Sequence, residues 1–345
     1  MTLRDEIFEQ PGVLARLLTG QVQQVEAIAA EIRKQPPSFI FVAARGTSDN
    51  AGRYANYLWG AKNGLPVALA TPSLFTYYQS PPVLKGALVV GISQSGQSPD
   101  IVGVLEEGRR QGCPTLAITN APESPLAQAA DFVIDIQAGV EAAVAATKTY
   151  SAQLMAIAML SAAVRNDQEM RIALAQAPGW MGQALALDEK IGRIAERYRY
   201  MSHCVVIGRG YNYATAFEWS LKLKELSYVV AEPYSSADFQ HGPIAMVDRG
   251  FPVMAVAPSG KVSENVVEML RRLREDLLAE LLVISDNPQA LAQAQSPLEL
   301  PHGMPEWLTP LVAIGPAQLF AYHLTRARGY DTEQPRIIHK VTETR

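Results

Sequence analysis

An internal repeat constrains the fold of this chain more than any other feature of its sequence. Three segments of the first half recur in the second half in the same order: 41–46 as 205–210, 95–96 as 259–260, and 118–120 as 284–287. The first two pairs are 164 residues apart and the third is 166 residues apart. Such regular spacing indicates the duplication of one structural unit.

Each half alternates short apolar runs with stretches of helical periodicity. In the first half the apolar runs are residues 39–42, 67–69, 87–90, 115–118 and 132–134. Uninterrupted apolar strands separated by helices are typical of a parallel sheet with helices on both faces. The sequence therefore predicts an α/β fold that is built twice.

The repeat and the helical stretches around it predict five regions. These are an N-terminal helical segment (1–34), a first domain (35–165), a helical linker (166–199), a second domain (200–330) and a C-terminal tail (331–345). Pro178-Gly179-Trp180 is expected to break the linker helix, and Gln334-Pro335-Arg336 argues against a helix in the tail.

Charge and composition exclude several classes of partner. The net charge is −4, with no basic surplus to indicate binding to nucleic acid or to an anionic membrane. No segment has the roughly 18 uncharged apolar residues that span a bilayer. The N-terminus resembles neither a signal peptide nor a transit peptide, so we expect a cytoplasmic protein.

The sequence also predicts no metal and no cofactor. The five histidines and the two cysteines, Cys113 and Cys204, lack metal-ligand spacing, and each cysteine lies beside a β-like run. We therefore expect both cysteines to be reduced core residues. Gly208-Arg209-Gly210 lacks the third glycine of a dinucleotide fingerprint, which argues against a nicotinamide cofactor.

A serine-rich loop, residues 93–98, follows a predicted strand and is a candidate anion site. Ser98 can cap the following helix, and Pro99 suits its first turn. Hydroxyls, a glutamine amide and the N–H groups of the helix start would converge there on an anion. A serine–glycine turn with a good helix cap explains the same residues. The loop is not a Walker A sequence, so it does not predict a nucleoside triphosphate.

A second polar loop follows the first predicted strand. Gly46, Thr47 and Ser48 come after Arg45, and a helical stretch follows them. Because ligands bind at the carboxyl ends of parallel strands, Thr47 and Ser48 are candidate contacts for the same ligand.

Glu218, Lys222 and Glu225 share one face of a predicted helix in the second half. Two explanations remain open. The three charges form a solvated helix face, or Glu225 is a positioned base with a cation beside it, as proton transfer between adjacent sugar carbons requires.

Two further residues are candidates for chemistry. His241 lies in a loop that Gly242-Pro243 closes, where a histidine can either act on a ligand or only hydrogen-bond its neighbours. Lys340 lies in the tail. A terminal lysine is normally inert, and as a nucleophile toward a carbonyl it would have to be covered and partly desolvated.

The chain resembles the double sugar isomerase (SIS) domain family, and in particular the isomerase part of glutamine–fructose-6-phosphate aminotransferase (glucosamine-6-phosphate synthase). The matching motifs are Glu9-Gln10-Pro11, Gly46-Thr47-Ser48, Ser93-Gln94-Ser95-Gly96, Ala145 to Lys148, Gln153-Leu154, Gly208-Arg209-Gly210, Leu221 to Glu225, His241-Gly242-Pro243, Ala321-Tyr322-His323 and Gln334-Pro335-Arg336. The resemblance implies two tandem SIS domains, each a five-stranded parallel sheet in an α-β-α sandwich with flavodoxin-like, doubly wound topology.

The resemblance also implies a role for each candidate residue. The 6-phosphate of a sugar would be held by Ser93, Gln94, Ser95 and Ser98, and the sugar by Thr47, Ser48 and the backbone of Val144. Glu225 would move a proton between C1 and C2 with the help of Lys222. His241 would assist ring opening, from the same chain or from the neighbouring subunit of a homodimer. Lys340 would form a Schiff base with the open-chain ketose.

The chain departs from the synthase pattern in ways that bear on its activity. A glutaminase domain and its N-terminal cysteine are missing, Arg45 replaces a cysteine, and Ala146 replaces a sugar-contacting serine. Residues 45–50 and the Lys340-Val341-Thr342 tail are more similar to stand-alone double-SIS proteins, which include aminosugar-6-phosphate deaminases and fructosamine-6-phosphate deglycases.

The leading hypothesis is therefore an aldose–ketose isomerase and deaminase that interconverts glucosamine 6-phosphate with fructose 6-phosphate and ammonia. The alternatives are a fructosamine-6-phosphate deglycase, a non-catalytic sugar-phosphate sensor, and an isomerase subunit that receives ammonia from a separate glutaminase. The expected partners are a sugar 6-phosphate and a second copy of the chain, without nucleic acid or membrane.

Overall fold

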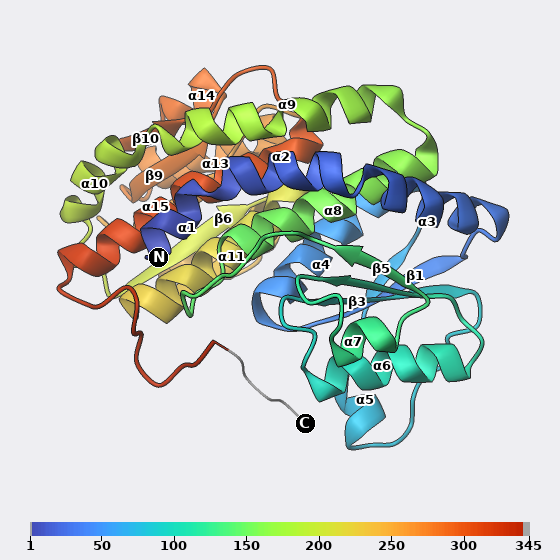
Figure 1. The fold of residues 1–345 in the computed structure, drawn as a ribbon. Coiled ribbons are helices and arrows are strands. Elements are labelled where there is room, and N and C mark those ends of the chain that lie inside the picture. Colours follow the sequence, from blue (N-terminus) through green and yellow to red (C-terminus); the bar gives the residue numbers. More distant parts are fainter. Residues whose placement is uncertain (1, 341–345) are drawn as a thin grey trace. The chain divides into compact units, whose positions relative to one another are not determined.

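The computed structural model describes residues 2–340, which form two compact units (Figure 1). The first unit comprises Gly12–Ala142, Lys148–Ala175 and the tail from His339. The second unit comprises the N-terminal residues to Pro11, Ala143–Thr147 and Gln176–Ile338. Each unit contains one five-stranded sheet.

The sheet of the first unit is parallel throughout, with strand order β2-β1-β3-β4-β5. Its strands are β1 (Phe39–Ala44), β2 (Val67–Leu69), β3 (Ala87–Ser93), β4 (Thr115–Thr119) and β5 (Phe132–Asp135). Every apolar run predicted from the first half is a strand. The order is that of a flavodoxin-like, doubly wound fold, which confirms the predicted fold class.

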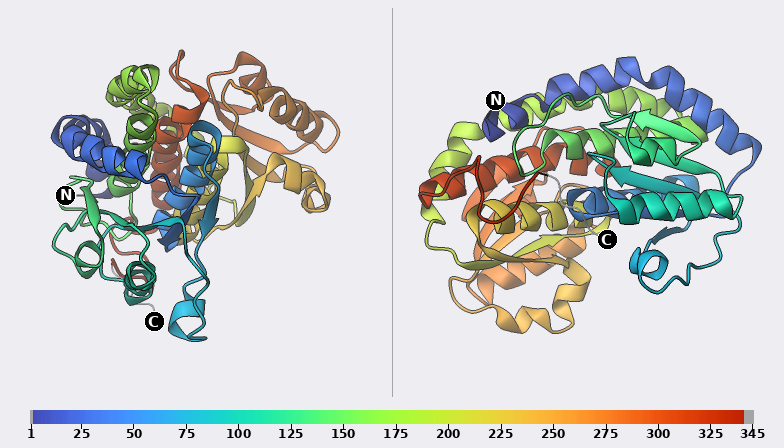
Figure 2. Two further views of the ribbon diagram at one scale, coloured as in Figure 1. Left: turned by 90° about the vertical axis from the view of Figure 1, so that its right-hand side faces the viewer. Right: turned by 60° about the horizontal axis from the view of Figure 1, so that its bottom comes forward.

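Helices cover both faces of this sheet (Figure 2). On one face, alternate strand residues such as Val89 and Ala117 pack in one core with α6 (Pro99–Arg110) and α7 (Pro125–Gln128). The other face carries α3 (Val22–Lys34), α4 (Gly46–Leu58) and α8 (Lys148–Arg165). The helix α8 is buried on all sides over its first 16 residues. Two shorter elements complete the unit, α2 (Gln10–Gly20) and α5 (Ser73–Thr76).

The second unit repeats this architecture with strand order β10-β9-β8-β6-β7. Its strands are β6 (His203–Gly208), β7 (Val230–Ser235), β8 (Pro252–Val256), β9 (Glu280–Ser285) and β10 (Ser296–Glu299), all parallel. Its helices include α10 (Asp188–Arg197), α11 (Tyr213–Lys222), α12 (Ser236–Gln240), α13 (Ser263–Glu275), α14 (Pro288–Leu291) and α15 (Thr309–Ala327). The two sheets have equivalent topologies, as duplication predicts.

The repeat extends to a rare local feature. The helix α4 continues into a π-helical turn, Trp59–Asn63, and α11 continues into another, Leu223–Ser227, 164 residues later. Each π turn ends at a residue in the left-handed region, Gly64 (φ 69°) in the first unit and Tyr228 (φ 56°) in the second. Isolated π turns are uncommon and frequently mark functional sites.

The linker differs from its prediction. A single helix, α9 (Gln168–Leu185), runs through Pro178 without a break, so the expected interruption at Pro178-Gly179-Trp180 is wrong. A proline removes only one backbone donor, and a helix held by packing on either side can tolerate that loss. The boundary between the two units nevertheless falls inside α9, at Ala175 and Gln176.

The first helix, α1 (Leu3–Phe8), is tied to the second unit by charged residues. Arg4 and His323 both bind the carboxylate of Asp188, at 2.6 and 2.7 Å, and the Leu3 N–H donates to Glu333 at 2.9 Å. Burial opposes ionisation of Asp188, but the hydrogen bonds from Arg4 and His323 lower its pKa below the ordinary value.

Two further expectations concern burial. Among residues 2–340, no helix combines the length and the apolar character needed to cross a bilayer. Cys113 and Cys204 are both free and buried, as predicted, and burial raises the pKa of the Cys204 thiol.

Candidate functional site

The serine-rich loop connects β3 to α6 at the carboxyl edge of the first sheet. The Gly96 N–H donates to Ser93 Oγ at 3.0 Å, and the Gln97 N–H donates to Ser95 Oγ at 3.3 Å. Gly96 has φ +63°, and a Cβ there would lie 2.0 Å from Ser124 Oγ, so only glycine fits. Both serine hydroxyls thus shape the loop as acceptors. Each keeps its own proton to donate to an anion.

Ser98 occupies the N-cap position of α6 and Pro99 follows it, as predicted. The side chain of Ser98, however, makes no capping hydrogen bond, so that part of the prediction is wrong. The reason is that the Ile101 N–H donates to the Ser98 carbonyl, at 3.1 Å. The hydroxyl of Ser98 is therefore not used for capping.

Thr47 and Ser48 lie in the first turn of α4, directly after β1. Ser48 is buried and accepts a hydrogen bond from Gln153 Nε2 at 3.0 Å. Because β1 and β3 are paired with Ala44 opposite Ile92, the start of α4 and the serine-rich loop leave the sheet side by side. The first unit thus brings two of the predicted polar loops to one edge.

Lys340 is held by a residue that the sequence did not single out. Its Nζ lies 2.6 Å from Glu141 Oε2, and the Glu141 side chain is fully buried. The same carboxylate accepts hydrogen bonds from the Thr149 N–H and Oγ1, at 3.1 and 2.8 Å. The lysine is itself only 23% exposed, so it is covered, as a nucleophile in this position would have to be. A lone glutamate among small residues of 138–147 is the signal that could have identified Glu141.

Val144 lies in the short segment Ala143–Thr147, which belongs to the second unit. The neighbouring Ala143 N–H donates to the carboxylate of Glu6, at 3.2 and 3.3 Å, and Glu6 is fully buried. The segment is therefore anchored to the N-terminal helix, while the contact of Val144 with a sugar stays a prediction.

The charged residues of α11 form a buried cluster. Lys222 Nζ lies 3.3 Å from Glu218 Oε1 and 2.6 Å from Glu225 Oε2. The side chains of Glu218 and Lys222 are 0% and 1% exposed, and that of Glu225 is 24% exposed. A solvated helix face is therefore excluded. Glu225 lies in the π turn and is the only one of the three carboxyl and amino groups with substantial access to solvent.

The two carboxylates control the charge of the lysine. Burial by itself would lower the pKa of Lys222, but the negative charges of Glu218 and Glu225 outweigh it and raise the pKa above the ordinary value. Lys222 is thus a permanent cation at neutral pH. Glu218, which had no assigned role, fixes this cation from the buried side.

The first unit lacks this cluster although it has the same helix. The residues of α4 and its π turn that correspond to Glu218, Lys222 and Glu225 are Tyr54, Leu58 and Ala61. Tyr54 and Leu58 are fully buried. The ionisable groups are therefore a property of one half of the repeat.

His241 is exposed and follows the short helix α12. Its N–H donates to the Asp238 carbonyl at 3.0 Å, and the next residue, Gly242, has φ +131°. The loop placement agrees with the sequence, and the action of His241 on a ring oxygen stays a prediction.

The second unit fills its own copy of the anion loop with a side chain. Ser259-Gly260 corresponds to Ser95-Gly96, and the Lys261 N–H donates to Glu306 Oε2 at 2.9 Å. A Cβ on Gly260 would lie 2.5 Å from the same oxygen, so the loop fits closely around the carboxylate. An internal anion thus takes the place that the first unit offers to a ligand.

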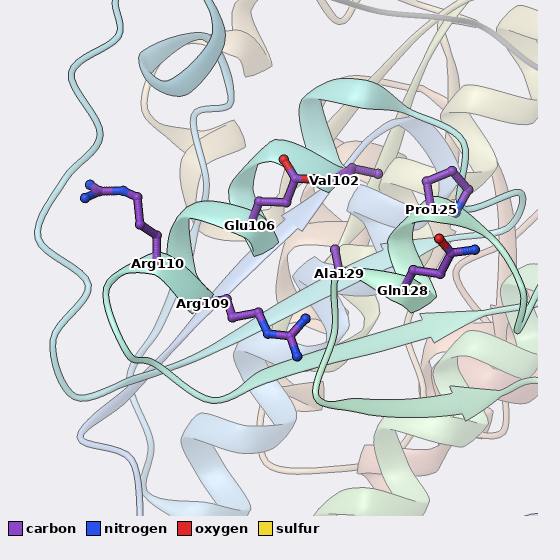
Figure 3. Close-up of a pocket in the computed structure, with 7 residues that line it drawn as sticks. All are labelled: Val102, Glu106, Arg109, Arg110, Pro125, Gln128 and Ala129. Atoms are coloured by element: carbon purple, nitrogen blue, oxygen red, sulfur yellow. The ribbon is translucent and has the colours of Figure 1, made fainter.

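A hollow of about 480 Å³ also lies in the first unit, over α6 and α7 (Figure 3). Val102, Glu106, Arg109, Pro125 and Gln128 are among the residues that line it. None of the candidate site residues lines this hollow. It lies along α6 beyond the helix start that the serine-rich loop precedes.

The structure groups the candidate residues by unit. The first unit holds Thr47, Ser48, Ser93, Gln94, Ser95, Ser98 and Lys340, and the second unit holds Val144, Lys222, Glu225 and His241. Within residues 2–340 no group of three or more His, Cys, Asp or Glu side chains is arranged to hold a metal ion.

Comparison with known proteins agrees with this picture. The SIS domain model matches the chain twice, at residues 33–163 and 199–327. The chain is 34% identical over 340 residues to glutamine–fructose-6-phosphate aminotransferase (isomerizing) of Aquifex aeolicus, which covers 97% of this chain and 56% of that protein. The corresponding enzyme of Gloeobacter violaceus is 35% identical, over 97% of this chain and 57% of its own length. The chain thus spans about half the length of these curated relatives.

Two solved structures are similar over nearly their full length. One is the C-terminal domain of glucosamine-fructose-6-phosphate aminotransferase from Francisella tularensis, with a TM-score of 0.89 and 30% identity over 96% of this chain and 98% of that one. The other is a candidate phosphosugar isomerase from Silicibacter pomeroyi DSS-3, with a TM-score of 0.86 and 34% identity over 96% of this chain and all of that one. The chain therefore belongs to the SIS domain family, in the phosphosugar isomerase superfamily, and is similar throughout to the isomerase part of glutamine–fructose-6-phosphate aminotransferase.

Proposed function

We propose that this chain is an aminosugar-6-phosphate isomerase and deaminase that interconverts glucosamine 6-phosphate and water with fructose 6-phosphate and ammonia. The observation that carries the proposal is the buried Lys222–Glu225 pair, with 2.6 Å between Nζ and Oε2. A purely binding module gains little from two buried charges, because removing charges from water costs free energy. A proton-transfer enzyme needs a carboxylate whose position and ionisation are fixed.

The serine-rich loop would bind the 6-phosphate. The protons of Ser93, Ser95 and Ser98 and the start of α6 are donors that suit an oxyanion. Thr47 and Ser48, which leave the neighbouring strand, would contact the sugar chain from the same edge.

Glu225 would carry the proton in the central step. After ring opening, which we assign to His241, the carboxylate takes the proton from C2 of the open-chain aldose and delivers it to C1. The C2 amine becomes an imine in this step. Hydrolysis of the imine then releases ammonia and leaves the ketose. Lys222, held as a cation by Glu218, keeps Glu225 ionised and oriented.

Lys340 would act on C2 of the ketose. Its amine would form a Schiff base with the carbonyl, and Glu141 positions it until the substrate arrives. We further propose that the active enzyme is a cytoplasmic homodimer with its site near the subunit interface.

A fructosamine-6-phosphate deglycase is the second candidate, and Ala146 favours it. This residue replaces a sugar-contacting serine of the synthase pattern and is only partly buried, which leaves space for an amino-acid adduct.

Incubation of the purified protein with glucosamine 6-phosphate tests the proposal directly. We expect stoichiometric release of ammonia and fructose 6-phosphate. Release of lysine from fructoselysine 6-phosphate, without ammonia from glucosamine 6-phosphate, would support the deglycase instead. Binding of both compounds without turnover would indicate a sensor.

A further inference from the structure

An ion pair joins the two polar loops of the first unit. Asp100, in the first turn of α6, is fully buried, and its Oδ2 accepts hydrogen bonds from Arg45 Nε and Nη2, both at 2.8 Å. Among the described residues, Asp100 Oδ1 has no hydrogen-bond partner. The pair thus depends on Arg45 alone, because no other residue described here compensates the carboxylate.

Asp100 is in an unfavourable place for a site that binds an anion. It lies two residues after Ser98, at the helix start whose N–H groups face the serine-rich loop. A buried carboxylate there competes for the same positive field and repels a phosphate, and burial weakens the solvent screening of that repulsion.

Arg45 is placed to remove this repulsion. It follows β1, and because Ala44 is opposite Ile92, Arg45 reaches the sheet edge next to Ser93. Its side chain is 49% exposed, so part of the guanidinium remains open toward solvent at that edge. Two of its five N–H donors point to Asp100, and the rest of its charge is available to the loop.

The second unit provides an internal comparison. Its equivalent arginine, Arg209, donates to Ser236 Oγ at 3.4 Å instead of to an acidic residue. The equivalent of Asp100 is Glu264, which is exposed. The buried Arg–Asp pair therefore accompanies the serine-rich loop and is not a general property of the repeated fold.

We propose that Arg45 is a positioning and specificity-determining residue that neutralises Asp100, so that the serine-rich loop accepts a phosphate dianion. This inference rests on the proposed role of the loop as the 6-phosphate site. It assigns the discrimination between a dianionic and a less charged ligand to one side chain outside the loop.

The test is a double-mutant cycle with Arg45→Met, Asp100→Asn and the double variant. The probe is glucitol 6-phosphate, which has no carbonyl and cannot react, and its Kd is measured by calorimetry on the full-length chain. We expect Arg45→Met to raise the Kd at least about tenfold near pH 8, because an uncompensated charge then faces the phosphate. Asp100→Asn in the same background should restore affinity to within about threefold of the wild type.

The pH dependence separates neutralisation from a structural role. A phosphate monoester carries its second negative charge only above about pH 6, so the effect of Arg45→Met should shrink to about threefold or less near pH 5. Equal weakening at both pH values, or a double variant as weak as Arg45→Met, would overturn the proposal. If Arg45→Met does not fold, Arg45→Lys keeps the positive charge and should stay within about threefold of the wild type at both pH values. A larger loss in that variant also contradicts neutralisation.

The outcome also separates this inference from the proposed function. A wild-type chain with no affinity for glucitol 6-phosphate refutes the phosphate site itself. A wild-type chain that binds the probe, together with an Arg45→Met variant that binds it equally well, refutes only the role of Arg45.

Discussion

Glu141 holds Lys340 at 2.6 Å by a carboxylate that is itself fully buried. The last described residue of the chain is therefore bound to the loop after β5 and is not a free end. This contact makes the tail part of the first unit and gives the lysine a defined place before any substrate binds.

Lys340→Arg tests the covalent role of this residue. An arginine retains the ion pair with Glu141 but cannot form an imine. We expect turnover of glucosamine 6-phosphate to be lost, together with the adduct that borohydride traps in the wild type, while the tail stays protected from carboxypeptidase. Glu141→Gln is the matched variant that should release the tail. Normal turnover by Lys340→Arg would exclude a Schiff base.

Glu225→Gln should separate proton transfer from binding. The amide keeps the shape of the side chain but cannot accept the substrate proton, so kcat should fall by roughly 10²- to 10⁴-fold. The Kd for glucitol 6-phosphate should stay within about threefold of the wild type, because the phosphate site is in the other unit. Glu232→Gln, at an exposed glutamate of β7, is the control and should behave like the wild type. A fully active Glu225→Gln variant would remove Glu225 from the mechanism.

Lys222→Met should destabilise the protein in a pH-dependent way. Removal of the lysine leaves the buried Glu218 without its cation, which costs about 3–5 kcal/mol near pH 7. Because the folded-state pKa of Lys222 is raised, its contribution is complete below the unfolded pKa of about 10.4 and is lost only as pH rises through the higher folded value. Urea unfolding at several pH values should therefore show a constant deficit from pH 7 to 9 that shrinks above pH 10.5. A neutral substitution at pH 7 would contradict the buried cluster.

Gly96→Ala tests the geometry of the serine-rich loop. An alanine must adopt φ +63° and place its Cβ 2.0 Å from Ser124 Oγ, so the loop has to shift. We expect phosphate affinity to drop by at least about tenfold, since the N–H donors would no longer converge. Gly112→Ala is the matched control. It has a similar φ of +74° with no atom within 4 Å of the new Cβ, so it should lose about 1 kcal/mol of stability and keep full affinity.

Glu306 predicts how many phosphates the chain binds. Because its carboxylate accepts from the Lys261 N–H at the start of α13, the second anion loop is already filled, and we expect one phosphate per chain. Glu306→Ala should open a second, weaker site, which equilibrium dialysis would detect as a second equivalent of phosphate. Two equivalents bound to the wild type would show that Glu306 does not fill the loop.

The sequence predicted the scaffold well because the scaffold depends on local patterns. Apolar runs such as residues 87–90 became buried strands, and the 164-residue repeat foretold two sheets of equal topology. Glycine and proline were less reliable guides in the linker, where α9 continues through Pro178 because tertiary packing outweighs the loss of one hydrogen bond.

The site was harder to predict because burial and charge pairing depend on residues far apart in the sequence. The spacing of Glu218, Lys222 and Glu225 showed that they share a face, but only the fold shows that the face is buried. Neither Glu141 beside Lys340 nor Asp100 beside Arg45 can be found from spacing, since 199 and 55 residues separate the partners. Such contacts follow from which loops the sheet brings to one edge.

The two π turns also record the history of the chain. A π turn arises when one extra residue is inserted into a helix, and both halves carry theirs at equivalent positions, Trp59–Asn63 and Leu223–Ser227. The insertion therefore predates the duplication and was inherited by both copies. The carboxylates and the lysine occur in one copy only, and the filled anion loop occurs in that same copy. After the duplication, one copy kept the task of ligand binding and the other became specialised for chemistry, so neither half alone retains the ancestral site.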